Sequence, residues 1–111
     1  MMGPEALLTE HIIGTTPDRE GIAIRCGWEV LHLRAARTRK GWVVPVTGSL
    51  GKGWPDLILV RPPRIIAAEL KAGRGKPTIE QLAVLGVLRQ AGVEVYIWRP
   101  EDWPAIVQTL R

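Results

Sequence analysis

Residues 54–71, W-P-D-L-I-L-V-R-P-P-R-I-I-A-A-E-L-K, decide the fold of this chain. They contain two apolar runs, residues 56–61 and 64–71, on either side of Pro62 and Pro63. Leu, Ile, Val and Ala dominate both runs, and proline cannot donate to a ladder of strand hydrogen bonds. The stretch therefore predicts two antiparallel strands that fold back on each other at the proline pair.

The register of this hairpin gathers charged residues at one end. Fold-back at the proline pair places Ile58 opposite Ala67 and Asp56 opposite Glu69. Because side chains alternate along a strand, Lys71 points to the same face as Glu69. Facing residues have Cβ atoms roughly 4.5–5.5 Å apart, and two like charges at that distance destabilise a sheet. A divalent cation between the two carboxylates would explain the pair.

The composition is that of one globular domain. The chain has 111 residues, of which 46% are hydrophobic and 23% charged, so we expect a single domain over residues 1–111. No apolar run approaches the roughly 20 residues that span a bilayer, and the first residues lack the pattern of a signal peptide. We therefore expect a cytoplasmic protein with no membrane partner. The lone Cys26 cannot form an internal disulfide and fits a reducing compartment.

Positive charge is concentrated in the middle of the chain. The formal net charge is +4, and residues 31–54 contain no acid. The basic residues of this segment are Arg34, Arg37, Arg39, Lys40 and Lys52, and Arg74 and Lys76 follow on a glycine-rich turn at residues 72–77. Clustered positive charge is typical of a surface that binds phosphates, so we expect these residues to bind DNA. A solvated basic loop is the open alternative.

The glycines around Lys52 do not form a nucleotide-binding loop. That motif needs four residues between its first glycine and a Gly-Lys pair, followed by Ser or Thr. Here only two residues separate Gly48 from Gly51, and Gly53 follows Lys52. We therefore expect no nucleotide cofactor.

Periodic patterns outline the other elements. They predict helices at residues 4–13, 18–26, 78–91 and 100–110, and strands at residues 28–34, 42–46, 56–61, 64–71 and 94–98. Strands that are apolar on both sides need cover on both faces. The predicted fold class is therefore α/β, with a mixed β-sheet flanked by helices on both faces.

The helix predicted at residues 78–91 has two special features. Thr78 and Gln81 have the spacing of a capping box, in which Gln81 bonds back to the Thr78 amide. The helix is also apolar around much of its circumference, whereas a surface helix shows one apolar stripe. We expect a second subunit to cover part of it, in a homodimer. Cover by the terminal helices of the same chain is the alternative.

Several motifs together resemble a nuclease family. They are Gly53-x-Pro55-Asp56, Glu69-Leu70-Lys71, Gln81 on the following helix, and V-Y-I-W-R-P-E-D-W at residues 95–103. With Gly27-Trp28 after the first helical segments, they make the chain similar to the PD-(D/E)XK nucleases. More narrowly, it resembles the small stand-alone virus-type replication-repair nuclease (VRR-NUC) domains. The resemblance covers most of the chain and implies a restriction-endonuclease-like core, in a phage or prophage protein of a bacterial host cell.

The resemblance implies metal-dependent hydrolysis of phosphodiester bonds in DNA. Asp56 and Glu69 would bind Mg²⁺ or Mn²⁺, with the backbone carbonyl of Leu70 as a third protein ligand. Lys71 would orient or help deprotonate the attacking water and stabilise the charged transition state.

The family also supplies a glutamate from the first helix. Glu10 is the favoured candidate, and Glu20 on the segment adjoining Gly27 is the alternative. Gln81 corresponds to an active-site residue of the family, while a helix cap is the other interpretation of the same residue. Both interpretations of Gln81 can hold if the start of its helix faces the metal.

The implied function is a DNA endonuclease that acts on structured DNA, similar to a Holliday-junction resolvase. Two active sites related by a two-fold axis suit symmetric cuts in a four-way junction. The alternatives are a flap or nicking nuclease of the same fold, and a DNA-binding module that keeps the fold without cleavage.

Overall fold

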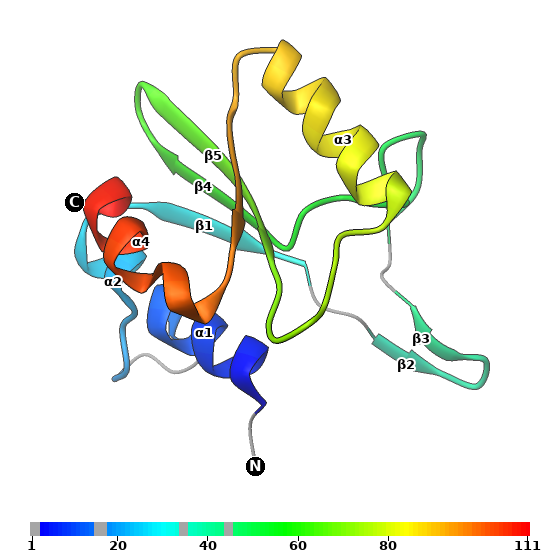
Figure 1. Cartoon of the computed structure of the whole chain (residues 1–111), viewed down its shortest axis with the longest axis horizontal. Coiled ribbons are helices and arrows are strands. Elements are labelled where there is room, and N and C mark those ends of the chain that lie inside the picture. The colour runs from blue at the N-terminus through cyan, green and yellow to red at the C-terminus, as the bar shows by residue number, and fades with distance from the viewer. Residues whose placement is uncertain (1–2, 15–17, 34–35, 44–45) are drawn as a thin grey trace.

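The computed structural model describes residues 3–14, 18–33, 36–43 and 46–111, with the backbone alone at residues 36–38 and 42–43. The elements in Figure 1 are α1 (Pro4–Ile13), α2 (Ile22–Arg25), β1 (Glu29–His32), β2 (Ala36–Thr38), β3 (Gly41–Val43), β4 (Leu57–Arg61), β5 (Arg64–Leu70), α3 (Ile79–Gln90), β6 (Glu94–Trp98), the 3-10 turn η1 (Pro100–Asp102) and α4 (Trp103–Leu110). The predicted α/β class is confirmed.

A mixed four-stranded sheet forms the centre of the fold. Its strands lie in the order β1-β4-β5-β6, in which β1, β4 and β5 are antiparallel and β6 runs parallel to β5. A parallel neighbour requires a crossover connection, and α3 supplies it. Strands β2 and β3 pair only with each other, in a hairpin that projects from the body of the protein (Figure 1).

The hairpin of β4 and β5 has the register predicted from the proline pair. Arg61 pairs with Arg64, and Ile58 pairs with Ala67. The ladder begins at Leu57, so Asp56 lies just before the first paired residue of β4. The hairpin therefore brings Asp56 to the end of β5, where the predicted site residues follow one another.

The hydrophobic core lies on one face of the sheet. Alternate residues of β4 and β5 point to this face, where α1, α2 and α4 cover them (Figure 1). The buried members are Leu8, Ile12, Ala23, Trp28, Leu57, Leu59, Ile66, Ala68, Leu70, Trp98, Ile106 and Leu110. Burial of a large aliphatic side chain contributes roughly 1.5–3 kcal/mol, so this face is the main source of stability.

Arg61 and Trp28 fasten helix α4 to the sheet. The Arg61 guanidinium donates to the carbonyl oxygens of Cys26 at 2.9 Å and Leu110 at 3.1 Å. Trp28 Nε1 donates to the same Leu110 carbonyl at 2.8 Å, and Arg61 lies over the Trp28 ring. The last carbonyls of a helix have no intrahelical partner, so these donors satisfy the end of α4 while they hold it in place.

Helix α3 covers part of the opposite face. Its residue Gln81 contacts Glu69, which points away from the core because it alternates with Ala68. Helices therefore flank both faces of the sheet, as predicted. The cover by α3 is incomplete, since Leu31 and Ile65 on this face are 51% and 46% exposed.

Two predicted helices have different bounds. The helix predicted at residues 18–26 is limited to Ile22–Arg25. Gly21 is extended and lies directly against the backbone of Ile12, where a side chain would not fit, so the helix begins only after this glycine. The helix predicted at residues 100–110 opens with η1 and continues as α4. None of the helices within the described residues is long and apolar enough to cross a membrane.

The basic segment contains a hairpin that was not predicted. Strand β2 pairs with β3, which takes the place of the strand predicted at residues 42–46. The strand predicted at residues 28–34 is limited to Glu29–His32. Residues 34–35 and 44–45 lie outside the described part of the chain. A three-residue strand such as β2 is too short to show alternation, which is why its sequence carries no signal.

Candidate active site

Asp56 and Glu69 come together at the end of β5. Asp56 Oδ2 accepts a hydrogen bond from the backbone N–H of Leu70 at 2.7 Å. Glu69, the residue before Leu70, is only 2% exposed. Strand β5 lies between β4 and β6, so the strand order buries this glutamate while the hairpin register brings Asp56 to it.

The Glu69 carboxylate has its donors on one oxygen. Gln81 Nε2 donates to Glu69 Oε1 at 3.0 Å, and Lys71 Nζ lies 3.8 Å from the same oxygen. Glu69 Oε2 is buried and has no hydrogen-bond donor among the residues that the structure describes. A buried oxygen without a partner costs free energy. Oε2 therefore marks a position where a cation or a further donor would be stabilising.

The pKa of Glu69 is raised from its ordinary value of 4.5 to about 8. The largest cause is burial, which removes water from the ionised carboxylate, and the neighbouring Asp56 carboxylate acts in the same direction. Lys71 lowers the pKa of Glu69 without compensating for these effects. Two carboxylates at one site resist ionising together, and a cation beside them removes this conflict.

The backbone N–H groups of Leu70 and Lys71 point to opposite sides of the strand. The Leu70 N–H points to Asp56, and the Lys71 N–H donates to the Trp98 carbonyl at 3.0 Å. In an extended strand the N–H and C=O of one residue point to the same side. The Leu70 carbonyl therefore faces the side of Asp56, as an additional oxygen ligand requires. The Lys71 side chain is 17% exposed and forms a wall of the site with limited solvent contact.

Gln81 joins the start of α3 to the buried carboxylate. Its backbone N–H donates to Thr78 Oγ1 at 3.1 Å, and its side-chain Oε1 accepts from the Thr78 N–H at 2.8 Å. The Nε2 end of the same amide donates to Glu69. The predicted capping box is confirmed, and the start of the helix faces the acidic site.

Helix α1 contributes Glu5 to the electrostatics of this site. The pKa of Glu5 is raised first by partial burial and then by the negative charge of Asp56, whereas Lys71 lowers it. Glu5 also helps to raise the pKa of Glu69. Glu5 is not among the residues predicted from the sequence. The only available signal is that an acid follows Pro4 in the first turn of the helix.

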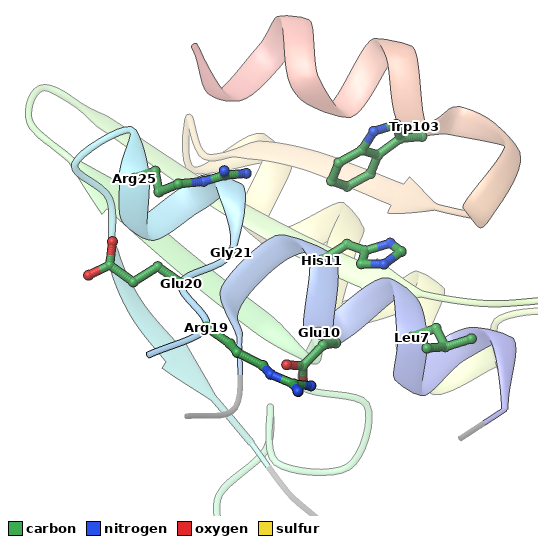
Figure 2. A pocket seen from close by; sticks show the side chains of 8 residues that line it. All are labelled: Leu7, Glu10, His11, Arg19, Glu20, Gly21, Arg25 and Trp103. Atoms are coloured by element: carbon green, nitrogen blue, oxygen red, sulfur yellow. The ribbon is translucent and has the colours of Figure 1, made fainter. Parts of the chain in front are cut away.

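Glu10 and Glu20, the predicted helical acids, lie in a different place. Both line a pocket of about 420 Å³ formed by α1, the segment before and within α2, and the start of α4 (Figure 2). Residues five apart on an α-helix are turned from each other by roughly 140°. Glu5 and Glu10 therefore face different directions, and the charge of Glu5 interacts with Asp56.

The Glu10 pocket has balanced charges. Arg19 and Glu10 both line it, and the rings of His11 and Trp103 meet edge to face with 5.6 Å between their centroids (Figure 2). Its charged lining residues are Glu10, Glu20, Arg19 and Arg25. With an arginine for each glutamate, the pocket lacks the excess of carboxylates that attracts a divalent cation.

The predicted DNA-binding residues occupy exposed turns. Arg39 and Lys40 form the turn between β2 and β3, and Arg74 and Lys76 lie on the turn after Lys71. Lys52 is also exposed. Arg34 and the side chain of Arg37 lie outside the described residues, so the structure does not place them. The described basic side chains are accessible to a phosphate backbone.

Arg99 holds the basic turn of residues 72–77 beside the site. Its guanidinium donates to the carbonyl oxygens of Gly73 at 3.3 Å and Gly75 at 2.8 Å. Arg99 follows β6 directly, and β6 pairs with β5, so the turn after β5 and the end of β6 lie at the same edge of the sheet. Arg74 and Lys76 are thus held next to the acidic residues.

The donor set fits a hard divalent cation. Within the described residues, no three His, Cys, Asp or Glu side chains lie close enough together to hold a metal ion by themselves. Mg²⁺, however, is commonly held by only one or two carboxylates and keeps several waters. Asp56, the partnerless Oε2 of Glu69 and the Leu70 carbonyl supply such a set.

Comparisons with known proteins do not assign this chain to a family. No family model matches it, and no curated protein matches it either. The interpretation of the site therefore rests on its geometry and chemistry.

Proposed function

We propose that this protein is a metal-dependent nuclease with a PD-(D/E)XK core, which hydrolyses phosphodiester bonds in DNA. The observation that carries the proposal is the acidic pair, in which Glu69 is buried beside Asp56 with one oxygen lacking a donor. A structural ion pair with Lys71 would not need the second carboxylate, which raises the free energy of ionised Glu69. A cation site with a lysine at its wall accounts for all three residues.

Each residue has a distinct role in this proposal. Asp56, Glu69 and the Leu70 carbonyl hold Mg²⁺ or Mn²⁺. The bound ion supplies a Lewis acid for the phosphate and lowers the pKa of water. Lys71 donates from its ammonium to the attacking water or to the charged phosphate oxygens. Gln81 keeps the Glu69 carboxylate in one orientation through the bond from Nε2 to Oε1.

The exposed basic turns support DNA as the substrate. The turn with Arg74 and Lys76 begins directly after Lys71 and is held by Arg99, so phosphates bound there lie beside the acidic site. Lys and Arg on exposed turns bind phosphates without reading sequence, which suits recognition of DNA by its shape. We propose that the substrate is structured DNA, and that a four-way junction is preferred over flap and nicked DNA.

The second candidate function is a DNA-binding module that does not cleave. The raised pKa of Glu69 favours it, because a protonated Glu69 needs no cation to satisfy the charge of the site. A cleavage assay separates the two functions. Labelled four-way junction, flap, nicked and linear duplex DNA are incubated with the protein in Mg²⁺, Mn²⁺ or EDTA. The nuclease proposal expects cutting that EDTA abolishes, whereas salt-sensitive binding with no cutting of any substrate would establish the binding module.

A Glu5→Gln variant is expected to cut DNA about tenfold to a hundredfold more slowly than the wild type, the usual cost of altering a residue that supports a metal site. The matched variant is Glu10→Gln, which makes the same change on the same helix but lies in the separate pocket of Figure 2. Cleavage rates measured over a series of Mg²⁺ concentrations compare them. A larger defect in Glu10→Gln than in Glu5→Gln would overturn the placement of the helical acid.

We further propose that the protein is a homodimer through α3 and the open part of the sheet. Ile79 and Leu82, three residues apart on α3, are 84% and 51% exposed, and apolar residues of the neighbouring sheet face are also exposed. Clustered exposed apolar residues mark interaction sites.

Light scattering should therefore give twice the 12.3 kDa mass of the chain. A Leu82→Glu variant should shift the mass toward one chain, because a charge buried in an apolar interface is unfavourable. Gln90→Glu is the control, since it adds a charge at an exposed polar position of the same helix. A wild-type mass near one chain would remove the dimer from the proposal.

A further inference from the structure

Gly53 lies in direct contact with the backbone of helix α3. Its φ is +115°, in the region that favours glycine. A methyl group built on its Cα would lie 2.5 Å from the Glu80 carbonyl oxygen, 2.6 Å from the Glu80 carbonyl carbon and 2.9 Å from Gln81 N. Real side chains do not approach backbone atoms so closely. The loop before β4 therefore rests on the peptide bond between Glu80 and Gln81, and only glycine permits that distance.

Gly53 and Gln81, on the two sides of this contact, are each linked to the acidic site. Asp56 follows Gly53 by three residues, and Pro55 between them is fully buried, which limits the freedom of the connection. On the other side, Gln81 bonds to Thr78 through its backbone and to Glu69 through its side chain. One close approach of two backbones thus joins the segment that carries Asp56 to the residue that orients Glu69.

An ion pair at the surface adds to the same contact. Lys52 Nζ lies 3.3 Å from Glu80 Oε1, on the residues that neighbour Gly53 and Gln81. Both side chains are substantially exposed, so the pair contributes little by itself. The backbone contact at Gly53 is the part that cannot adjust, because its atoms belong to a helix rather than to a flexible side chain.

We propose that Gly53 is a positioning residue, which seats the loop on the first turn of α3 and thereby holds the Gln81 amide on Glu69 Oε1. With Oε1 occupied in this way, Oε2 is left as the oxygen that is free to bind a cation. The role in catalysis rests on the proposed function, but the contact and its effect on Gln81 do not. Gly53 acts through Gln81 and does not touch the reacting atoms.

Gly53→Ala and Gly48→Ala form a matched pair that separates close approach from backbone strain. Gly48 lies on the same loop and also has a positive φ, at +92°, but no described atom lies within 4 Å of a Cβ built there. Alanine is disfavoured at both positions because of φ. Only at Gly53 does the added methyl also displace the start of α3.

The first measurement uses the metal-free protein and needs no activity. NMR follows hydrogen exchange of the Gln81 side-chain amide, which is slowed when Nε2 donates to a buried carboxylate. We expect exchange to become up to about tenfold faster in Gly53→Ala, the size expected for loss of one buried hydrogen bond, and to stay unchanged in Gly48→Ala. Equal exchange in Gly53→Ala and the wild type, or equal acceleration in both variants, would overturn the proposal.

The second measurement asks whether Gly53 acts through Gln81. Mg²⁺ affinity is determined calorimetrically for Gly53→Ala, Gln81→Ala and the double variant. We expect each single variant to bind about tenfold more weakly and the double variant to be no weaker than Gln81→Ala, because coupled residues are not additive. Additive losses would show that Gly53 does not act through Gln81.

Two further observations keep the outcomes distinct. If Gly53→Ala does not fold, a nuclear Overhauser effect between the Gly53 α-protons and the Gln81 amide proton tests the contact in the wild type, and its absence refutes the proposal. If the wild-type protein neither binds Mg²⁺ nor cuts DNA, the proposed function fails while the exchange result still decides the role of Gly53.

Discussion

A Lys71→Ala variant is expected to cut DNA more slowly by about 10²–10⁴, the usual contribution of a group that transfers or donates a proton in the transition state. The Lys71 ammonium lies 3.8 Å from Glu69 Oε1, and its side chain is only 17% exposed. It can therefore reach a water or phosphate at the acidic pair but not the distant parts of a DNA duplex. Single-turnover rates in Mg²⁺ measure cleavage, and dissociation constants in EDTA measure binding, which should stay close to the wild-type value.

Lys76→Ala is the control for this variant. Lys76 is exposed on the turn that follows Lys71, so its loss should weaken DNA binding, lower the salt dependence of the affinity and leave the rate at saturating protein unchanged. The two lysines are close in sequence but should affect different steps. Cleavage by Lys71→Ala at the wild-type rate would remove Lys71 from the active site.

The metal-free protein is expected to become less stable as the pH rises from 5 to 8. The pKa of Glu69 is about 8 in the folded chain and has its ordinary value of 4.5 when the chain is unfolded. Between these values the folded chain keeps a proton that the unfolded chain has released, so the free energy of unfolding falls with rising pH. The slope contributed by Glu69 is at most about 1.4 kcal/mol per pH unit.

Urea unfolding at several pH values in EDTA measures this effect, and Glu69→Gln isolates it. The glutamine has the same size and cannot ionise, so its variant should lose the slope contributed by Glu69 and be more stable than the wild type at pH 8. Saturating Mg²⁺ should stabilise the wild type at pH 8, by about 2.7 kcal/mol at one hundred times the dissociation constant, and should not stabilise the variant. Glu29→Gln, at an exposed position of β1, should keep the wild-type slope. Identical slopes in Glu69→Gln and the wild type would contradict the buried ionisable pair.

The β4–β5 hairpin shows which features follow from local pattern. A slip of one residue would turn every side chain to the wrong face, so a proline pair between two apolar runs leaves one register in which Ile58 meets Ala67. The proximity of Asp56 and Glu69 follows from that register. The cap formed by Thr78 and Gln81 is local in the same sense, because its partners are three residues apart.

The acid on the N-terminal helices could not be identified from local sequence pattern. Glu5, Glu10 and Glu20 are all acids near the N-terminal helices, and their spacing does not reveal which of them faces β5. Packing of Leu8 and Ile12 against the sheet sets the rotation of α1 about its axis. This rotation places the Glu5 carboxylate where it interacts with the negative charge of Asp56. The choice between these acids depends on contacts between residues far apart in the chain.

The amino-acid sequence was sufficient for the α/β class, the register of the central hairpin and the grouping of Asp56, Glu69 and Lys71, because alternation and turn formation act over a few neighbouring residues. The tertiary structure alone decided that Glu69 is buried with a raised pKa and that Gly53 rests on the start of α3. The burial of a side chain, the charges around it and the close approach of two backbones all depend on which elements pack together. No pattern within a single element contains that information.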